Sequence, residues 1–240
     1  MLVTIYNDSE IYSFSNKVGL LYIRNLGNLD TRKITLSTGE IELGSRTFRT
    51  RKSTLNDVSS SIERGPQIVL PKDVAQICFE LDLPFSSRLL EIGGGAGGFS
   101  ILAALMYKLR IVSYELDEEY FRLMKRNIAR FEVEEFIDAN NRDGKEADIN
   151  SFESIFIDNP EPWNFLDTKL TGDKKVSTIL PTYSQAERFS RFLLKKGFLV
   201  NVHELIDVPM QLSAMGMRPE TSFLYHTGFI VSGVGVNLNG

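Results

Sequence analysis

The stretch "SIFIDNPEPWN", residues 154–164, ends an apolar run in a carboxylate and an amide. The apolar residues 155–157 predict a buried strand, and Asp158 stands where that strand ends. Parallel sheets bind their ligands at the carboxyl ends of strands, so Asp158 is a candidate catalytic residue. A second interpretation is that Asp158 caps a short helix after the strand, with the two prolines fixing the turn.

A glycine-rich loop lies upstream, in "LLEIGGGAGGFS" (89–100), between a predicted strand and a predicted helix. Glycines at this place let the backbone approach a ligand at the helix N-terminus. Gly93, Gly95 and Gly98 match the dinucleotide pattern G-x-G-x-x-G. Glu91, Gly93, Gly95 and Gly97 also match E-x-G-x-G-x-G, which is typical of S-adenosylmethionine (SAM) methyltransferases.

Electrostatics favours SAM over a dinucleotide. A dinucleotide would place its pyrophosphate on this loop, where the carboxylate of Glu91 would repel it. SAM has no phosphate but carries an ammonium and a sulfonium, which a carboxylate attracts. Glu115, at the end of the next predicted strand, is suited to the ribose hydroxyls of either cofactor. No Gly-Lys-Ser/Thr follows the glycines, which excludes a phosphate-binding P-loop.

The elements around these residues alternate between strand and helix from Leu70 onward, which predicts a doubly wound parallel sheet with helices on both faces. The predicted strands are 87–92, 110–116, 134–139, 154–158 and 175–180, with closing strands in "FLVNVHELI" and "GFIVSG". The predicted helices are 71–83, 97–109, 117–131 and 183–197.

Residues 1–60 follow a different pattern and predict a small β domain, with the catalytic domain in residues 61–240. The short alternating segments "LVTIY", "VGLLYI", "KITLS" and "IELGSRTFRT" are typical of a small antiparallel sheet or barrel. Arg46, Arg49 and Arg51 lie in the last of these and its continuation, and they form either a solvated strand face or a phosphate-contacting patch.

The composition sets outer bounds on function. With 42% hydrophobic and 24% charged residues, the 240-residue chain is ordinary for a globular protein. We expect no membrane span, and a lone cysteine with two distant histidines predicts neither a disulfide nor a metal site. The cysteine usage fits a reducing cytoplasm. The net charge of −4 argues weakly against a protein coated in nucleic acid.

Six segments resemble the tRNA (adenine-N1)-methyltransferases that modify a T-loop adenine, and they occur in the same order as in that family. The resemblance is strongest to the archaeal branch of the family. The six segments are "RGPQIVLPKD", "EIGGGAGGFS", "SYELDEEYFRLMKRNI", "IDNPEPW", "PTYSQAERF" and "RPETSFLYHTGFI". The resemblance runs from about Arg64 to the end of the chain. It implies a Rossmann-like SAM methyltransferase domain, tRNA as the substrate and a homotetramer.

The resemblance also implies roles for matched positions. Asp158 would be the active-site carboxylate and Glu115 would hold the SAM ribose. The other positions expected at the cofactor are Gln67, Leu70, Glu91, Gly93, Gly95, Gly97, Gly98, Phe99, Ser100 and Asn140.

Several positions depart from the family pattern. Leu70 replaces an aromatic residue that is common near the target base, and Ser222 replaces a common basic residue. Asn140 occupies the position of an acidic residue near the SAM adenine, with Asp138 and Asp143 as alternatives. Trp163, Arg218 and His226 are further candidates for RNA contact, although core packing, a subunit interface and a structural histidine remain open for them.

Methylation of adenine N1 needs orientation more than a strong base, because that nitrogen is unprotonated at pH 7. A carboxylate that accepts a hydrogen bond from the exocyclic N6 would stabilise the positive charge of the product. A folded T-loop would hide the base, so we expect the base to flip into the pocket. The alternatives are a non-catalytic tRNA-binding subunit and a SAM methyltransferase acting on an exocyclic base amine, a protein or a small molecule.

Overall fold

The computed structural model divides the chain into two compact units. One contains Met1–Ile68 and Gly94–Asp143, and the other contains Val69–Gly93 and Gly144–Gly240. The structure describes residues 1–65, 68–166, 170, 174–222 and 225–236, and Gln67 lies outside them. The predicted boundary at residues 60 and 61 falls within a helix, and the division into two domains stays a prediction.

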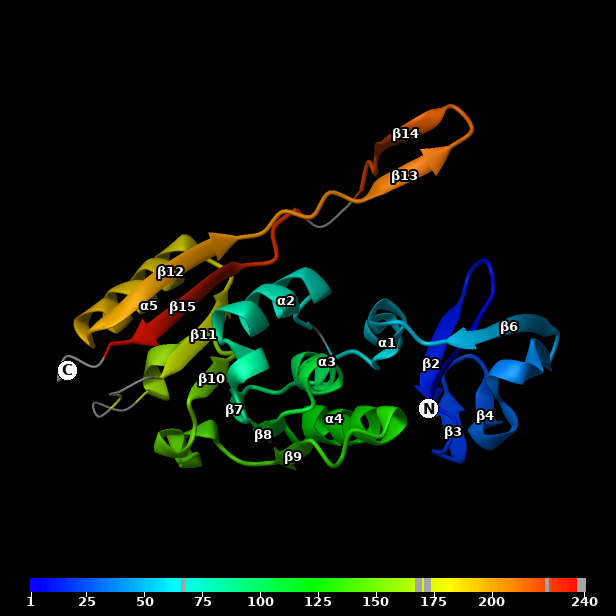
Figure 1. The fold of residues 1–240 in the computed structure, drawn as a ribbon, viewed down its shortest axis with the longest axis horizontal. Helices are drawn as coiled ribbons and strands as arrows, with labels where there is room; N and C mark the ends of the chain where they lie inside the picture. The colour runs from blue at the N-terminus through cyan, green and yellow to red at the C-terminus, as the bar shows by residue number, and fades with distance from the viewer. Residues whose placement is uncertain (66–67, 167–169, 171–173, 223–224, 237–240) are drawn as a thin grey trace. The chain divides into compact units, whose positions relative to one another are not determined.

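The first unit combines the N-terminal strands with the strands and helices that follow the glycine loop (Figure 1). Its strands are β1 (Leu2–Tyr6), β2 (Ile11–Ser15), β3 (Leu20–Ile23), β4 (Gly27–Asp30), β5 (Glu40–Leu43), β6 (Arg46–Lys52), β8 (Arg110–Tyr114) and β9 (Ile137–Asn140). Its α-helices are α1 (Leu55–Ser61), α3 (Gly98–Tyr107) and α4 (Glu118–Phe131).

The N-terminal strands form an antiparallel sheet in the order β2-β1-β6-β5, with β3 and β4 as a separate hairpin. This confirms an antiparallel N-terminal β region. The "KITLS" segment is not a strand, however, because two 3₁₀ turns, Thr31–Lys33 and Leu36–Thr38, occupy this region. The hydroxyl of Thr38 accepts the N–H of Thr35, a local bond that replaces pairing with a neighbouring strand.

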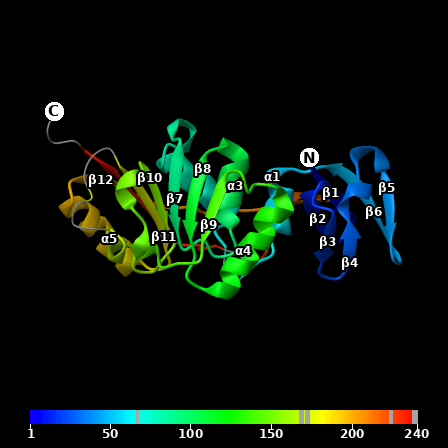
Figure 2. The ribbon, with the colours of Figure 1, turned by 90° about the horizontal axis from the view of Figure 1, so that it is seen from below.

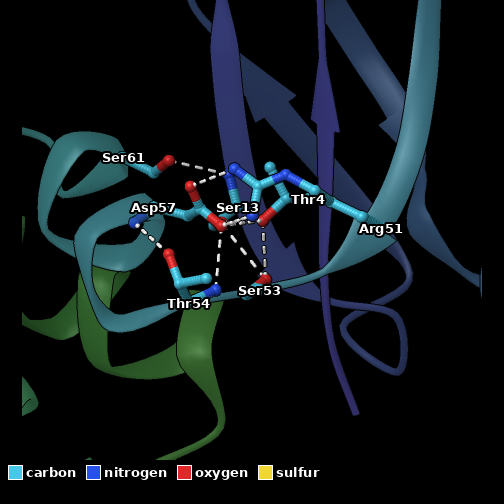
Figure 3. A network of polar contacts seen from close by, with 7 residues as sticks. All are labelled: Thr4, Ser13, Arg51, Ser53, Thr54, Asp57 and Ser61. Carbon is cyan, nitrogen blue, oxygen red and sulfur yellow. Dashed lines mark hydrogen bonds and ion pairs between the residues drawn. The ribbon is translucent and has the colours of Figure 1, made fainter.

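A polar network joins the N-terminal sheet to α1 (Figure 3). The α1 segment lies in a stretch that the sequence marks only as polar, and Thr54 caps its first turn. Asp57 accepts hydrogen bonds from the Thr54 N–H and from Arg51. Burial raises the pKa of the Asp57 carboxyl, but these bonds outweigh it, so the pKa is lowered overall.

Helix α4 also packs on β2, and a buried arginine supplies a bond between them. The Nε of Arg130, whose side chain is buried, donates to the Ser13 carbonyl over 2.9 Å. Ser15 donates to Glu132 at the end of α4. The N-terminal sheet is therefore held by specific polar contacts within this unit.

The second unit contains most of the central sheet. Its strands are β7 (Arg88–Ile92), β10 (Ser154–Ile157), β11 (Lys175–Leu180), β12 (Phe198–Glu204), β13 (Met210–Ser213), β14 (Gly216–Pro219) and β15 (Phe229–Gly235). Its α-helices are α2 (Pro71–Glu80) and α5 (Tyr183–Lys195), and its 3₁₀ turns are η3 (Leu83–Phe85), η4 (Gly144–Glu146), η5 (Ile149–Ser151) and η6 (Pro162–Asn164).

Within the second unit the strand order is β12-β15-β11-β10-β7, and within the first unit β8 lies beside β9 (Figure 2). The pairs β7–β10, β10–β11 and β8–β9 are parallel, as predicted. β15 runs antiparallel to both of its neighbours, so the expectation of a wholly parallel sheet is wrong. No crossover helix separates β12 from β15 in the described part of this connection, and without one a parallel connection is disfavoured.

The core of the second unit explains its regular strands. Ile155, Phe156 and Ile157 are each 0% exposed, which confirms the predicted buried strand. α2 packs on β11 and β15, and α5 packs on β11, β12 and β15. In the described part of the chain, no helix is both long and apolar enough to cross a membrane.

Candidate active site

The end of β10 meets the start of the glycine loop. Strands β7 and β10 are paired in register, and the Asp158 N–H donates to the Ile92 carbonyl over 2.8 Å. Gly93 has a φ of +86°, and a Cβ at this position would overlap with the carbonyl oxygen of Asp158. Only glycine satisfies both conditions, so the backbone of Asp158 rests directly on Gly93.

The loop that follows Asp158 is shaped by its neighbour. The side chain of Asn159 accepts the N–H of Glu161 over 2.9 Å, and Glu161 is the residue that precedes η6. The alternative in which Asp158 caps the following helix is therefore wrong. Asp158 itself is exposed at the carboxyl edge of its strand.

The continuation of the glycine loop lies in the first unit. Gly95 and Gly97 have φ values of +53° and +83°, whereas Gly98 is the first residue of α3 and is not among the residues with positive φ. With Gly93, the positive φ values follow the spacing E-x-G-x-G-x-G. Gly97 is also packed closely, because an added Cβ would lie 3.0 Å from Met124 Cγ.

Glu115 follows β8 and is 9% exposed. Its carboxylate accepts the N–H of Gly95 over 2.7 Å and the N–H of Asp117 over 2.8 Å. Glu115, the residue predicted to bind the ribose, is thus hydrogen-bonded to the glycine loop within the first unit.

The end of β9 lies against Glu115. The Glu115 N–H donates to the Asn140 carbonyl over 3.0 Å, while the Asn140 side chain turns back to the Asp138 carbonyl. The neighbouring Asn141 donates to the Glu115 carbonyl over 2.8 Å. Sequence reasoning missed Asn141, which supports Glu115 directly. In the sequence, only its position just after a strand marks Asn141 as a candidate.

The remaining cofactor candidates divide by burial. Glu91 is 1% exposed within β7, which is unusual for a carboxylate. Phe99 and Ser100 are also buried, so the first turn of α3 turns these side chains inward. Leu70 precedes α2 and is half-buried. Its carbonyl accepts bonds from the first turn of that helix.

The three arginines of β6 are all engaged with carboxylates. Arg46 binds Glu10 over 2.8 Å, Arg49 lies 3.6 Å from Glu40, and Arg51 binds the buried Asp57. These guanidinium groups therefore lie on an ion-paired strand face, and their contact with RNA phosphates stays a prediction.

His226 and Arg218 lie in different parts of the second unit. The His226 ring bonds Glu204 over 2.7 Å and the Pro181 carbonyl over 3.0 Å, so both ring nitrogens have protein partners. Arg218 is exposed on β14, opposite Gln211.

A lysine that sequence reasoning did not select fixes the chain next to His226. Lys72, in the first turn of α2, donates to the Thr227 hydroxyl over 2.6 Å and to the Leu205 carbonyl over 2.9 Å. It also pairs with Asp73, which is fully buried. These contacts attach the start of α2 to the segments before and after the β13–β14 hairpin.

Comparison with solved structures defines the class of fold. A SAM-dependent O-methyltransferase from Thermotoga maritima superposes with a TM-score of 0.78 at 24% identity, over all of this chain and 94% of that protein. The tRNA (m1A58) methyltransferase TrmI from Aquifex aeolicus gives 0.74 at 22% identity, over 99% of this chain and 97% of that one. The fold is therefore the Rossmann-like fold of SAM-dependent methyltransferases.

Sequence comparison narrows this class to a family. The family model described as "tRNA methyltransferase complex GCD14 subunit" matches residues 52–211, and the chain belongs to this family. A relative in Methanocaldococcus jannaschii, named tRNA (adenine(57)-N(1)/adenine(58)-N(1))-methyltransferase TrmI, is 24% identical, and the match covers 86% of this chain and 85% of that protein. TrmI of Thermus thermophilus, named for adenine 58, is 25% identical over 75% and 74% of the two chains.

Proposed function

We propose that this protein is a methyltransferase that transfers the methyl group of SAM to N1 of an adenine in the T-loop of tRNA. Its family membership and the names of its relatives support this reaction. The observation that carries the proposal is that Asp158 rests on the backbone of Gly93, in a loop with the spacing E-x-G-x-G-x-G.

The loop fits SAM better than it fits a dinucleotide. A Cβ on Gly95 would meet no atom within 4 Å, so the backbone at this point is open to a ligand. The carboxylate of Glu91, which precedes the loop in sequence, would repel a pyrophosphate. When bound, SAM supplies an electrophilic methyl group on a sulfonium. Glu115 would hold the ribose hydroxyls with its remaining acceptor sites, and Asn140, Asp138 or Asp143 would face the adenine.

Asp158 acts on the substrate base in this proposal. Its carboxylate accepts a hydrogen bond from the exocyclic N6 of adenine, which orients the N1 lone pair toward the methyl group. As the N1–methyl bond forms and the bond from the methyl group to sulfur breaks, the positive charge would pass from the sulfonium to the ring, a neutral thioether would leave, and the nearby carboxylate would stabilise the charged ring. No proton has to be removed from N1, so orientation supplies most of the acceleration.

Radiolabelled SAM and unmodified tRNA test the reaction, with 1-methyladenosine identified by nucleoside mass spectrometry. We expect Asp158→Ala to lower kcat by about 10²- to 10³-fold. SAM affinity measured by calorimetry should stay unchanged. Glu161→Gln is the matched control, since it removes a nearby charge but keeps an acceptor for Asn164. SAM binding without any methyl transfer would overturn the function, whereas normal turnover by Asp158→Ala would overturn only the role of Asp158.

We also propose that residues 1–60 form an RNA-contacting domain and that the protein works in the cytoplasm. RNA phosphates at β6 would exchange with the internal carboxylate partners of Arg46 and Arg49. The Arg49–Glu40 pair is exposed, and such pairs contribute only about 0–1 kcal/mol, so its exchange for a phosphate costs little.

We propose a homotetramer in which the β13–β14 hairpin contacts another subunit. Leu212 pairs with Met217, and Met210 pairs with Pro219, so one face of the hairpin is apolar. Leu212 and Met217 are 83% and 68% exposed. An exposed apolar face of this kind marks a protein interface.

A further inference from the structure

A groove beside the sole tryptophan combines an aromatic platform with basic side chains. It has a volume of about 530 Å³ and lies between η6 and the outer face of α5. The guanidinium of Arg188 stacks on the Trp163 ring, 3.8 Å above its centroid. Arg191 and Lys195 continue along the same wall.

The helix places these cations in one row. Ser184, Arg188, Arg191 and Lys195 follow the i, i+4, i+7, i+11 spacing of a single helix face. The opposite face, with Ala186, Phe189 and Leu193, is buried. Arg188 and Lys195 are seven residues apart, which is about 10 Å along the axis. The row is therefore long enough to meet successive phosphates of one strand.

The groove is electropositive although the chain as a whole carries a charge of −4. Its three cations face one carboxylate, Glu187, which leaves a local charge of +2. Glu187 pairs with Arg191 at the helix surface, where both side chains are largely exposed. Such pairs contribute only about 0.3–0.5 kcal/mol. Among the described residues, neither Arg188 nor Lys195 has an ion-pair partner.

The two elements that line the groove, η6 and α5, are both joined to the loop that follows Asp158. Trp163 lies five residues after Asp158, and the Gln185 side chain in the first turn of α5 donates to the Pro160 carbonyl over 3.1 Å. One end of the groove is thus fixed to the chain that presents the candidate catalytic carboxylate.

We propose that this groove binds nucleotides of the tRNA that adjoin the target adenine. An unpaired base stacks on the Trp163–Arg188 pair, while Arg191 and Lys195 contact the phosphates. Base–aromatic stacking together with phosphate contacts is the usual way in which proteins bind single-stranded RNA. This inference rests on the proposed function, since it takes tRNA as the substrate.

The test compares a double variant, Arg188→Gln/Lys195→Gln, with wild-type protein in tRNA binding over a range of salt concentrations. Each lost phosphate contact lowers the slope of log K against log salt by about 0.7–0.9. The double variant loses the phosphate contact of Lys195 and therefore about 0.7–0.9 of slope, which is about 5- to 8-fold of the affinity gained between about 1 M and 0.1 M salt. KM for tRNA should rise, with kcat and SAM affinity unchanged.

The matched control is Arg88→Gln. The Arg88 guanidinium also covers an aromatic ring, Phe152, at 4.7 Å, but it lies at the amino end of β7. This variant should bind tRNA like wild type. Trp163→Phe should keep most of the affinity, and Trp163→Leu should lower it, because phenylalanine retains an aromatic ring on which a base can stack and leucine does not.

The outcomes separate the inference from the proposed function. If wild-type protein does not methylate tRNA, the proposed function fails. If wild type methylates tRNA and the double variant has an unchanged salt slope and KM, the groove does not bind RNA. A double variant with unchanged RNA binding but an altered oligomeric state would show that another subunit covers the groove, and it would overturn the inference.

Discussion

Gly93 is the residue on which the contact between the two strand ends depends. A side chain there is disfavoured twice, by the positive φ and by the overlap with Asp158. We expect Gly93→Ala to cost about 3 kcal/mol of unfolding free energy, with about 1–2 from the backbone and the rest from overpacking. It should also abolish SAM binding.

Gly95→Ala is the matched comparison for Gly93→Ala. Its φ is also positive, but a Cβ would meet no atom within 4 Å. It should cost only about 1 kcal/mol. Urea unfolding and SAM calorimetry measure both variants, and equal losses in the two would refute the steric argument.

His226 gives a prediction about pH. The hydrogen bond to Glu204, reinforced by the one to the Pro181 carbonyl, raises the pKa of the His226 imidazole above its ordinary value of 6.5. A raised folded-state pKa contributes stability that is fully present below about pH 6.5 and is lost as the pH rises through the folded pKa. NMR titration of the ring should give a midpoint above 6.5 that falls in Glu204→Gln. A midpoint at or below 6.5 in wild type would contradict this prediction.

The sequence predicted some of these single residues and not others. Glu91 and the glycine spacing are local, so they could be recognised along the chain. The two partners of His226 lie 22 and 45 residues away in the sequence. The partner of Arg46 lies 36 residues away. Only the folded chain brings such groups together, which is why these residues looked available for RNA.

At the scale of elements, the start of α2 is bonded to the chain segments that precede and follow the β13–β14 hairpin. Lys72 is 15% exposed and its partner Asp73 is 0% exposed. Lys72→Met leaves a buried carboxylate without its cation, which we expect to cost about 3–5 kcal/mol. Urea unfolding measures this loss.

The double variant Lys72→Met/Asp73→Asn separates charge from packing. It removes the buried charge as well as its partner, so it should be more stable than Lys72→Met alone. If both variants were equally destabilised, the contacts of Lys72 with Leu205 and Thr227 would account for the whole effect.

Strands and helices with a clear period were predicted well, because burial of one face sets that period. β7, β10 and β11 begin or end within a residue of their predicted bounds. The errors fell where side chains bond to the nearby backbone, as at Thr35–Thr38 and in the Thr54 cap of α1. Such bonds stabilise turns and short helices that hydrophobic periodicity does not mark.

At the scale of the whole molecule, the alternation of strands and helices predicted the class of fold but not the direction of β15. Its direction depends on the connection through the β13–β14 hairpin, which replaces a crossover helix. Periodicity does not specify which neighbours a strand pairs with, so a mixed sheet was not foreseen.

At the scale of the whole molecule, we predict that the β13–β14 hairpin joins subunits. Leu212→Glu/Met217→Glu places two charges on the apolar face of the hairpin and should shift light-scattering masses from tetramer to smaller species. Ser213→Glu, on the polar face, should leave the mass unchanged. A wild-type monomer, or an unchanged mass in the double variant, would show that the hairpin does not join subunits.

The two backbone N–H bonds that Glu115 accepts have a consequence for the energetics of cofactor binding. They hold the loop at Gly95 in shape by contacts made during folding. The conformational entropy of ordering this loop is therefore lost when the chain folds and not when the cofactor arrives. Binding of the cofactor at this end of the loop therefore requires little reordering of the chain.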